Sequence, residues 1–119
     1  MNNKKLGASF EREFCELLAA NGWWVHFITP AANGGQPFDV IACKDGGCKV
    51  FDCKTSAVHI FPYTRLEDNQ IMAFEKWLSC GNEEPNVAVK YNDRIYLIGY
   101  RRLKALGKVD LNREREYTP

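Results

Sequence analysis

The sequence predicts a single α/β domain, residues 1–119, with a central mixed β-sheet of about five strands flanked by helices. A length of 119 residues suits one domain with one hydrophobic core. Helical and strand patterns follow one another in the order α-β-β-β-α-β-β, with hairpins on both sides of the second helix. Hydrophobic residues make up 45% of the chain and aromatic residues 13%, which is typical of a folded protein.

The first predicted element is a helix from about Lys4 to Ala20, which ends at Asn21-Gly22. Its apolar residues recur at helical spacing and form one face. They are Leu6, Phe10, Phe14, Leu17 and Leu18. Aromatic and β-branched residues then predict a strand from Trp23 to Thr29, and a loop from Pro30 to Pro37 follows.

A hairpin is expected next, with strands at Phe38–Cys43 and Cys48–Thr55 around a turn at residues 44–47. Residues 56–65 read as irregular, and the last dozen residues as loosely held. The remaining predicted elements are a helix at Asp68–Ser79, a hairpin of Val87–Tyr91 and Arg94–Tyr100 across Asn92-Asp93, and a short helix at Arg101–Leu106.

Composition excludes several classes of protein. No apolar run approaches the roughly 20 residues of a membrane span, and the N-terminus has no apolar signal core. We therefore expect a cytoplasmic protein without membrane contact. The five cysteines are expected to be free thiols, and none of them form a pair at zinc-ligand spacing. We expect His26 and His59 to be structural or surface residues.

The net charge of +1 neither indicates nor excludes a nucleic-acid-binding protein. Six basic residues lie within residues 101–115, and Lys4, Lys5 and Arg12 form a second group. Either group could contact phosphate, but charge alone favours a solvated surface for both.

Two acids and a lysine occupy the predicted hairpin. If Gly46-Gly47 is a two-residue turn, Asp39 lies opposite Lys54, and Asp52 shares their face. A shift of one residue would separate the group. The hairpin therefore predicts that two carboxylates and an ammonium converge.

Neighbouring carboxylates repel unless a cation joins them, and Mg²⁺ prefers such oxygen ligands. The backbone carbonyl of Cys53 lies between Asp52 and Lys54 and adds a further possible ligand. Lys54 could orient or deprotonate a water, or stabilise developing charge. These groups suit metal-assisted phosphodiester hydrolysis. The alternative is an ordinary cross-strand ion pair between Asp39 and Lys54.

The motif Pro37-Phe38-Asp39 followed by Asp52-Cys53-Lys54 resembles the signature of the PD-(D/E)XK nuclease superfamily. Within it the chain resembles Holliday-junction resolvases of the archaeal Hjc and bacterial RecU types over about residues 5–100. The segment from Gly7 to Glu13 is similar to the archaeal opening, and the segment from Phe51 to Ser56 to the RecU-type core, together with Phe61-Pro62 and Gln70. The resemblance implies a restriction-endonuclease-like core.

The resemblance also implies roles for individual residues. Glu11 would join Asp39 and Asp52 as a metal ligand, and Gln70 would lie near the site. Glu11 has the alternative of a solvated helix acid, and Gln70 of a capping or packing residue. Asp52 stands where resolvases more usually carry Glu, and the chain has no room for the inserted stalk of RecU-type enzymes.

We therefore predict a Mg²⁺-dependent endonuclease, with Mn²⁺ as a possible substitute, that resolves four-way DNA junctions as a homodimer. The alternatives are a related nuclease that acts on duplex DNA and an inactive DNA-binding module on the same fold. The loop at residues 31–36 is expected to approach DNA, and the Trp23-Trp24 pair is read as core or dimer interface. The candidate phosphate contacts are Lys4, Lys5, Arg12, Lys44, Thr55 and Arg65.

Overall fold

The computed structural model describes the backbone of residues 3–28 and 36–119 and the side chains of residues 9–28 and 36–119. Five strands form a mixed sheet in the order β1-β2-β3-β5-β6, in which β3 runs parallel to β5 and the other neighbours are antiparallel. The predicted mixed sheet is confirmed. Its strands are β1 (Trp24–Phe27), β2 (Val40–Lys44), β3 (Gly47–Thr55), β5 (Asn86–Tyr91) and β6 (Arg94–Gly99).

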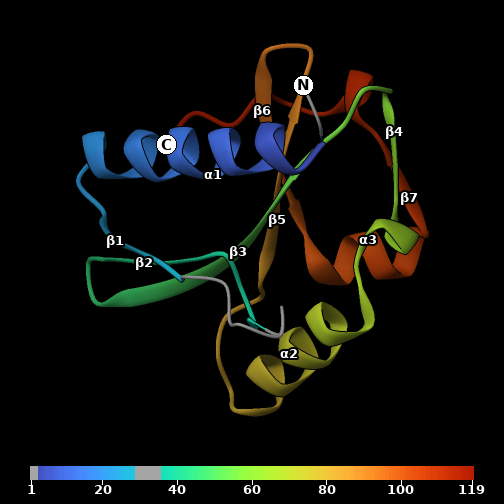
Figure 1. Cartoon of the computed structure of the whole chain (residues 1–119). Coiled ribbons are helices and arrows are strands. Elements are labelled where there is room, and N and C mark those ends of the chain that lie inside the picture. The colour runs from blue at the N-terminus through green and yellow to red at the C-terminus, as the bar shows by residue number, and fades with distance from the viewer. Residues whose placement is uncertain (1–2, 29–35) are drawn as a thin grey trace.

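Helices cover both faces of this sheet (Figure 1). The helix α1 (Asn3–Ala20) packs on one face, whereas α2 (Asp68–Ser79) and α3 (Tyr100–Leu106) contribute to the core on the other. None of the described helices is long and apolar enough to cross a membrane.

The central strand β3 contributes to both cores because its side chains alternate between the faces. Val50 packs with the α2 and α3 side, and Phe51 with the α1 side, where its ring meets that of Phe14 edge-on at a centroid distance of 5.1 Å. All three side chains are fully buried. Packing on both faces of the sheet therefore holds this strand in place, and the positions of its residues are well defined.

The turn of the first hairpin lies one residue earlier than predicted. Asp45 and Gly46 have φ values of 52° and 81°, which are the two left-handed positions of a type I′ turn, and Lys44 pairs with Gly47. The register is therefore shifted by two residues from the predicted one. This shift leaves every β3 side chain on its predicted face but changes its partner.

The shifted register places Cys43 directly opposite Cys48, with their Cα atoms 4.2 Å apart, and the two form a disulfide. The prediction of free thiols is wrong for this pair, because it did not anticipate the Asp45-Gly46 turn. Cys15, Cys53 and Cys80 are free thiols as predicted.

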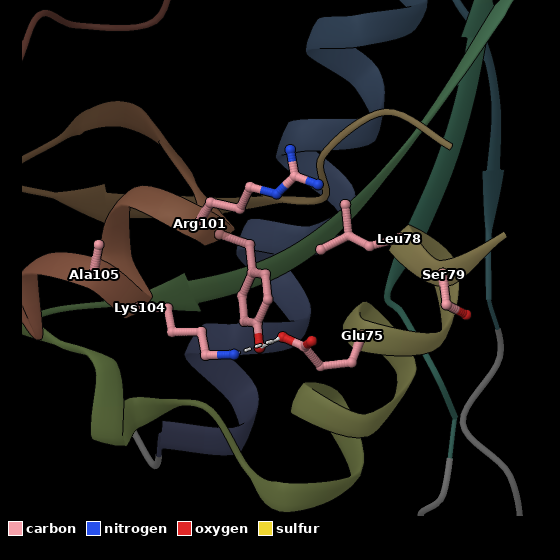
Figure 2. Close-up of a pocket in the computed structure, with 7 residues that line it drawn as sticks. Glu75, Leu78, Ser79, Arg101, Lys104 and Ala105 are labelled. Carbon is pink, nitrogen blue, oxygen red and sulfur yellow. Dashed lines mark hydrogen bonds and ion pairs between the residues drawn. The ribbon is translucent and has the colours of Figure 1, made fainter. Parts of the chain in front are cut away.

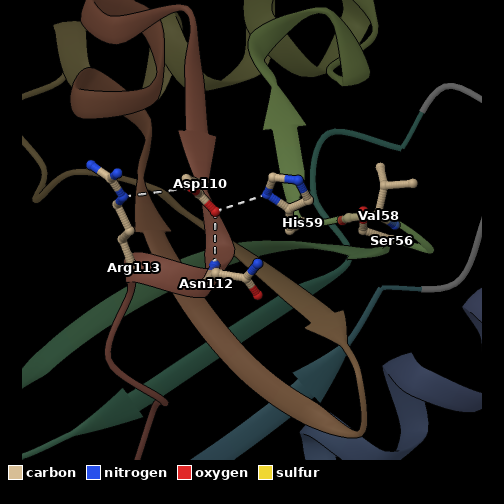
Figure 3. Close-up of polar contacts among 6 residues, drawn as sticks. All are labelled: Ser56, Val58, His59, Asp110, Asn112 and Arg113. Atoms are coloured by element: carbon tan, nitrogen blue, oxygen red, sulfur yellow. Dashed lines mark hydrogen bonds and ion pairs between the residues drawn. The ribbon is translucent and has the colours of Figure 1, made fainter.

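The last dozen residues are packed, not loosely held, so that prediction is wrong. A second sheet pairs β4 (Ile60–Pro62) with β7 (Lys108–Asp110), and Leu111 beyond it is fully buried. Asp110 accepts hydrogen bonds from the ring of His59 at 3.0 Å and from the Asn112 N–H at 3.0 Å (Figure 3). Two short 3-10 helices follow these strands, at Tyr63–Arg65 and Leu111–Arg113.

Replacing Cys43 and Cys48 together by serine should destabilise the protein by about 2 kcal/mol, since the bond closes only a short loop. The measurement is the midpoint of denaturant unfolding under non-reducing conditions. Cys80→Ser, at an exposed free thiol, is the control and should leave the midpoint unchanged. Alkylation of five thiols in the unreduced, unfolded protein would contradict the disulfide.

Candidate active site

The site lies where β3 extends beyond the end of its pairing with β2. The ladder between them ends with Val40 paired to Phe51, whereas β5 accompanies β3 from Phe51 to Thr55. Beyond Phe51, β3 therefore has β5 on one edge and no paired strand among the described residues on the other. Side chains and backbone groups at this open edge can meet a ligand.

Asp39 reaches this edge because the backbone leaves strand geometry there. Its N–H donates to the Phe51 carbonyl at 3.1 Å, although Val40 is the residue that pairs with Phe51. Its own carbonyl accepts from the Ile28 N–H at 2.9 Å, on the other side. Two residues facing one is the arrangement of a β-bulge, which re-aims a side chain.

The carboxylate of Asp39 is held by the backbone of β3. Its Oδ2 accepts a hydrogen bond from the Cys53 N–H at 2.8 Å, and the side chain is only 6% exposed. The N–H and carbonyl of a strand residue point to the same edge, so the Cys53 carbonyl faces the open edge too. Asp39 thus lies beside the acid that precedes Cys53.

That acid, Asp52, is 1% exposed, and its two carboxylate oxygens have different surroundings. Oδ1 accepts from the Gln70 amide at 2.9 Å. Oδ2 lies 3.4 Å from the Lys54 ammonium and has no hydrogen-bond partner among the described atoms. The ion pair that the alternative interpretation assigned to Asp39 and Lys54 is formed instead by Asp52 and Lys54.

Gln70 serves two purposes with one amide group. Its Oε1 accepts from the Glu67 N–H at 2.9 Å and completes a capping box at the start of α2, while its Nε2 holds Asp52. The structure therefore shows the capping contact and also places the Gln70 amide against Asp52. The cap fixes which way the amide points, so Gln70 positions the Asp52 carboxylate.

The acids perturb one another. The pKa of Asp52 is raised well above its ordinary value by burial and by Asp39, and Lys54 only partly opposes this. Burial, and then Asp39, also raise the pKa of Glu11 on α1 to about 7, while Lys54 lowers it. Glu11 therefore lies within electrostatic reach of Asp39 and Lys54.

A cation fits the chemistry of these groups better than a further hydrogen bond does. The buried, unpartnered oxygen of Asp52 next to the carboxylate of Asp39 offers two oxygen ligands, and the Cys53 carbonyl faces the same edge. In the part of the chain that the structure describes, no three acidic, histidine or cysteine side chains are grouped so that they could hold a metal ion.

The predicted phosphate contacts do not all gather here. Arg65 donates to the Thr55 carbonyl at 2.9 Å, so both lie at the end of β3 next to Lys54. Lys44 is bound to the Asn21 carbonyl at 2.8 Å, at the opposite end of β2 from Asp39. The side chains of Lys4 and Lys5 and the loop at residues 31–36, apart from Gln36, lie outside the described residues.

A small hollow of about 260 Å³ adjoins the site on the α1 side, and the sequence did not predict it. It is lined by Glu11, Arg12, Cys15 and Phe27. Phe27 is 40% exposed. Phe27 is exposed because β1 lies at the edge of the sheet. The order of strands in a sheet cannot be predicted from the local sequence pattern.

The larger hollow, of about 640 Å³, lies elsewhere between α2 and α3 (Figure 2). Its carboxylate, Glu75, accepts from the Tyr100 hydroxyl at 2.5 Å and from Lys104 at 3.1 Å, and these bonds lower its pKa. A carboxylate with two such partners is a structural contact. Neither Asp39 nor Asp52 lines this hollow.

Comparisons with known proteins agree with this geometry. A family model described as archaeal Holliday junction resolvase (Hjc) matches residues 2–117. A crossover junction endodeoxyribonuclease Hjc of Methanocaldococcus jannaschii is 29% identical over 102 residues, 86% of this chain and 71% of that protein. The solved structure of Hjc from Archaeoglobus fulgidus, a Holliday junction resolvase, matches with a TM-score of 0.70 and 18% identity over 89% of each chain. This likeness shows a shared fold.

Asp52→Asn should raise the melting temperature of the metal-free protein at pH 8, by about 5 °C if the gain is near 1 kcal/mol. A raised pKa means that the folded state prefers the protonated acid, so wild-type stability falls as pH rises above the ordinary value of 3.8. The amide removes this repulsion, can donate to Asp39 and still accepts from Gln70. The gain should shrink toward pH 5.

The control is Asp110→Asn. The pKa of Asp110 is lowered, first by its hydrogen bond with His59, so its ionised form stabilises the fold. This variant should therefore melt below the wild type at pH 8. A lower melting temperature for Asp52→Asn in a chelating buffer would contradict the electrostatic account of the acidic pair.

Proposed function

Since the chain belongs to the archaeal Holliday junction resolvase (Hjc) family, we propose that it is a metal-dependent endonuclease that cuts DNA phosphodiesters at four-way junctions. The observation that carries the proposal is the buried Asp39 and Asp52 pair, with an unpartnered oxygen next to Lys54. The M. jannaschii relative is named a crossover junction endodeoxyribonuclease, which supports the same substrate.

Asp39, Asp52, Glu11 and the Cys53 carbonyl would hold the cation. Their donors are all oxygen, which favours Mg²⁺, with Mn²⁺ as a substitute. A bound cation of this kind supplies a polarised phosphoryl oxygen and a more acidic water. Holding it also relieves the repulsion from Asp39 that adds to the effect of burial in raising the pKa of Asp52 and Glu11.

Lys54 is the residue that faces the reacting phosphate. Its ammonium lies 3.4 Å from Asp52, and its side chain is 15% exposed, so the group is held at the surface of the site. There it can orient the attacking water or stabilise charge on the phosphorane oxygens. Gln70 keeps Asp52 from rotating away during this step. Thr55, Arg65 and Arg12 contact the flanking DNA.

A four-way junction has two equivalent strands to cut, so we propose that two copies of the chain act as a homodimer. Each copy supplies one set of Asp39, Asp52 and Lys54. Paired, symmetrical nicks in one junction are the signature of such an assembly.

Wild-type protein with Mg²⁺ should cut a synthetic four-way junction at paired positions and leave a linear duplex of the same sequence intact. Lys54→Ala should lower the single-turnover rate about 100-fold or more while junction binding is kept. Asp52→Asn should abolish cleavage and keep binding. Gel analysis of end-labelled junctions measures each outcome.

Equal cleavage of the duplex would instead indicate a nuclease without junction preference. Wild type and Asp52→Asn behaving alike would indicate an inactive DNA-binding module. Single, unpaired nicks would contradict the homodimer.

Glu11→Gln should raise the Mg²⁺ concentration needed for half-maximal cleavage, because the site loses one of its three carboxylates. Excess chelator should stop wild-type cleavage, and added Mg²⁺ should restore it. The matched control is Glu13→Gln on the same helix, whose carboxylate is 2.5 Å from the Lys90 ammonium. If both variants require the same Mg²⁺ concentration as the wild type, Glu11 is not a ligand.

A further inference from the structure

A second polar contact lies on the open edge of β3, beyond the acidic pair. The Ser56 N–H donates to the Lys90 carbonyl of β5 at 2.9 Å, so the backbone groups of the preceding residue, Thr55, face away from β5. They face the same edge as the Cys53 N–H that holds Asp39. Two residues of a strand span roughly 7 Å, which separates the two contacts along the edge.

The guanidinium of Arg65 occupies this second position. Its Nη2 donates to the Thr55 carbonyl at 2.9 Å, and its central carbon lies 5.2 Å from the centroid of the Phe61 ring. Phe61 is fully buried in the core, so the ring is a fixed surface for the guanidinium. Two contacts from different directions therefore hold an otherwise flexible side chain beside the site.

The charge of Arg65 is not neutralised within the described part of the chain, where no carboxylate lies within ion-pair distance of it. Arg102 and Arg113, in contrast, pair with Glu114 and Asp110. A guanidinium has five N–H donors, and the Thr55 carbonyl takes one of them. The remaining donors can form two parallel hydrogen bonds with one oxyanion. Arg65 is also exposed to solvent.

We propose that Arg65 forms a second phosphate-binding site, which holds the phosphate next to the scissile one on the same DNA strand. This rests on the proposed function, in which the scissile phosphate lies at Asp39 and Asp52. The roughly 7 Å between the two edge contacts is comparable to the spacing of neighbouring phosphates along a strand. Holding the neighbour fixes the register and direction of the strand through the site.

The experiment neutralises one phosphate and one side chain in turn. Four-way junctions carry a single uncharged methylphosphonate linkage on either side of the scissile phosphate. At one of these two positions, the methylphosphonate should lower the wild-type cleavage rate, measured at subsaturating protein concentration, about tenfold. This is the size expected for the loss of one charge-assisted hydrogen bond. Arg65→Gln, which keeps an amide donor for Thr55, should be about tenfold slower on the unmodified junction. The methylphosphonate at that position should then lower the cleavage rate of Arg65→Gln less than about twofold.

The matched control is Arg113→Gln, which removes the same charge from an arginine that is paired with Asp110. It should show the full wild-type penalty for the neutral linkage. If Arg65→Gln melts well below the wild type, Arg65→Lys replaces it, and the linkage must cost that variant less than it costs the wild type.

Equal penalties in the wild type and the Arg65 variants at both positions would overturn the second phosphate site and leave the proposed nuclease intact. An uncut junction in the wild type would instead overturn the proposed function, and the Arg65 site with it.

Discussion

The antiparallel pairing of β2 with β3 breaks at Asp39, and the arrangement of the whole site depends on that break. A regular strand would send the Asp39 carboxylate to one face of the sheet. With Asp39 and Val40 both opposite Phe51, the carboxylate instead lies in the edge, where it meets the Cys53 N–H. Pro37, which has no N–H to donate, precedes the break and does not favour continuing the ladder. The edge of β3 is thereby left open for Lys54, Gln70 and a substrate.

Burying two acids at this edge works against stability. Asp52 is 1% exposed, and one of its oxygens has no hydrogen-bond partner in the described structure. Lys54 at 3.4 Å and Gln70 at 2.9 Å offset only part of the desolvation. The fold tolerates this because two apolar layers, one under α1 and one under α2 and α3, hold β3 in place. A site that is poorly satisfied without a cation is the expected compromise between stability and catalysis.

Patterns with a fixed period could be predicted from the sequence, and contacts set by strand register could not. The face shared by Asp52 and Lys54 was predictable, because a two-residue shift preserves it. The partner of Lys54 and the Cys43–Cys48 bond depended on whether Asp45-Gly46 or Gly46-Gly47 forms the turn. The roles of Glu11 and Gln70 came from family resemblance alone, since a helix acid and a capping glutamine carry no local signature of a site. The pairing of β4 with β7 joins segments about fifty residues apart and leaves no local trace.

The chain returns to one short stretch of β3 from three directions. Asp39 arrives from before β2 and binds the backbone of Cys53, Arg65 arrives from the segment after β4 and binds Thr55, and Gln70 arrives from α2 and binds Asp52. Two of these side chains have a second contact: Arg65 with the Phe61 ring, and Gln70 with the Glu67 N–H at the helix cap. Because the backbone of β3 is the common reference, a displacement of α2 or of the Phe61 core would move acid and guanidinium relative to one another. The spacing of the polar groups is therefore a property of the packed sheet, and core substitutions far from the acids should alter how the site meets a DNA strand.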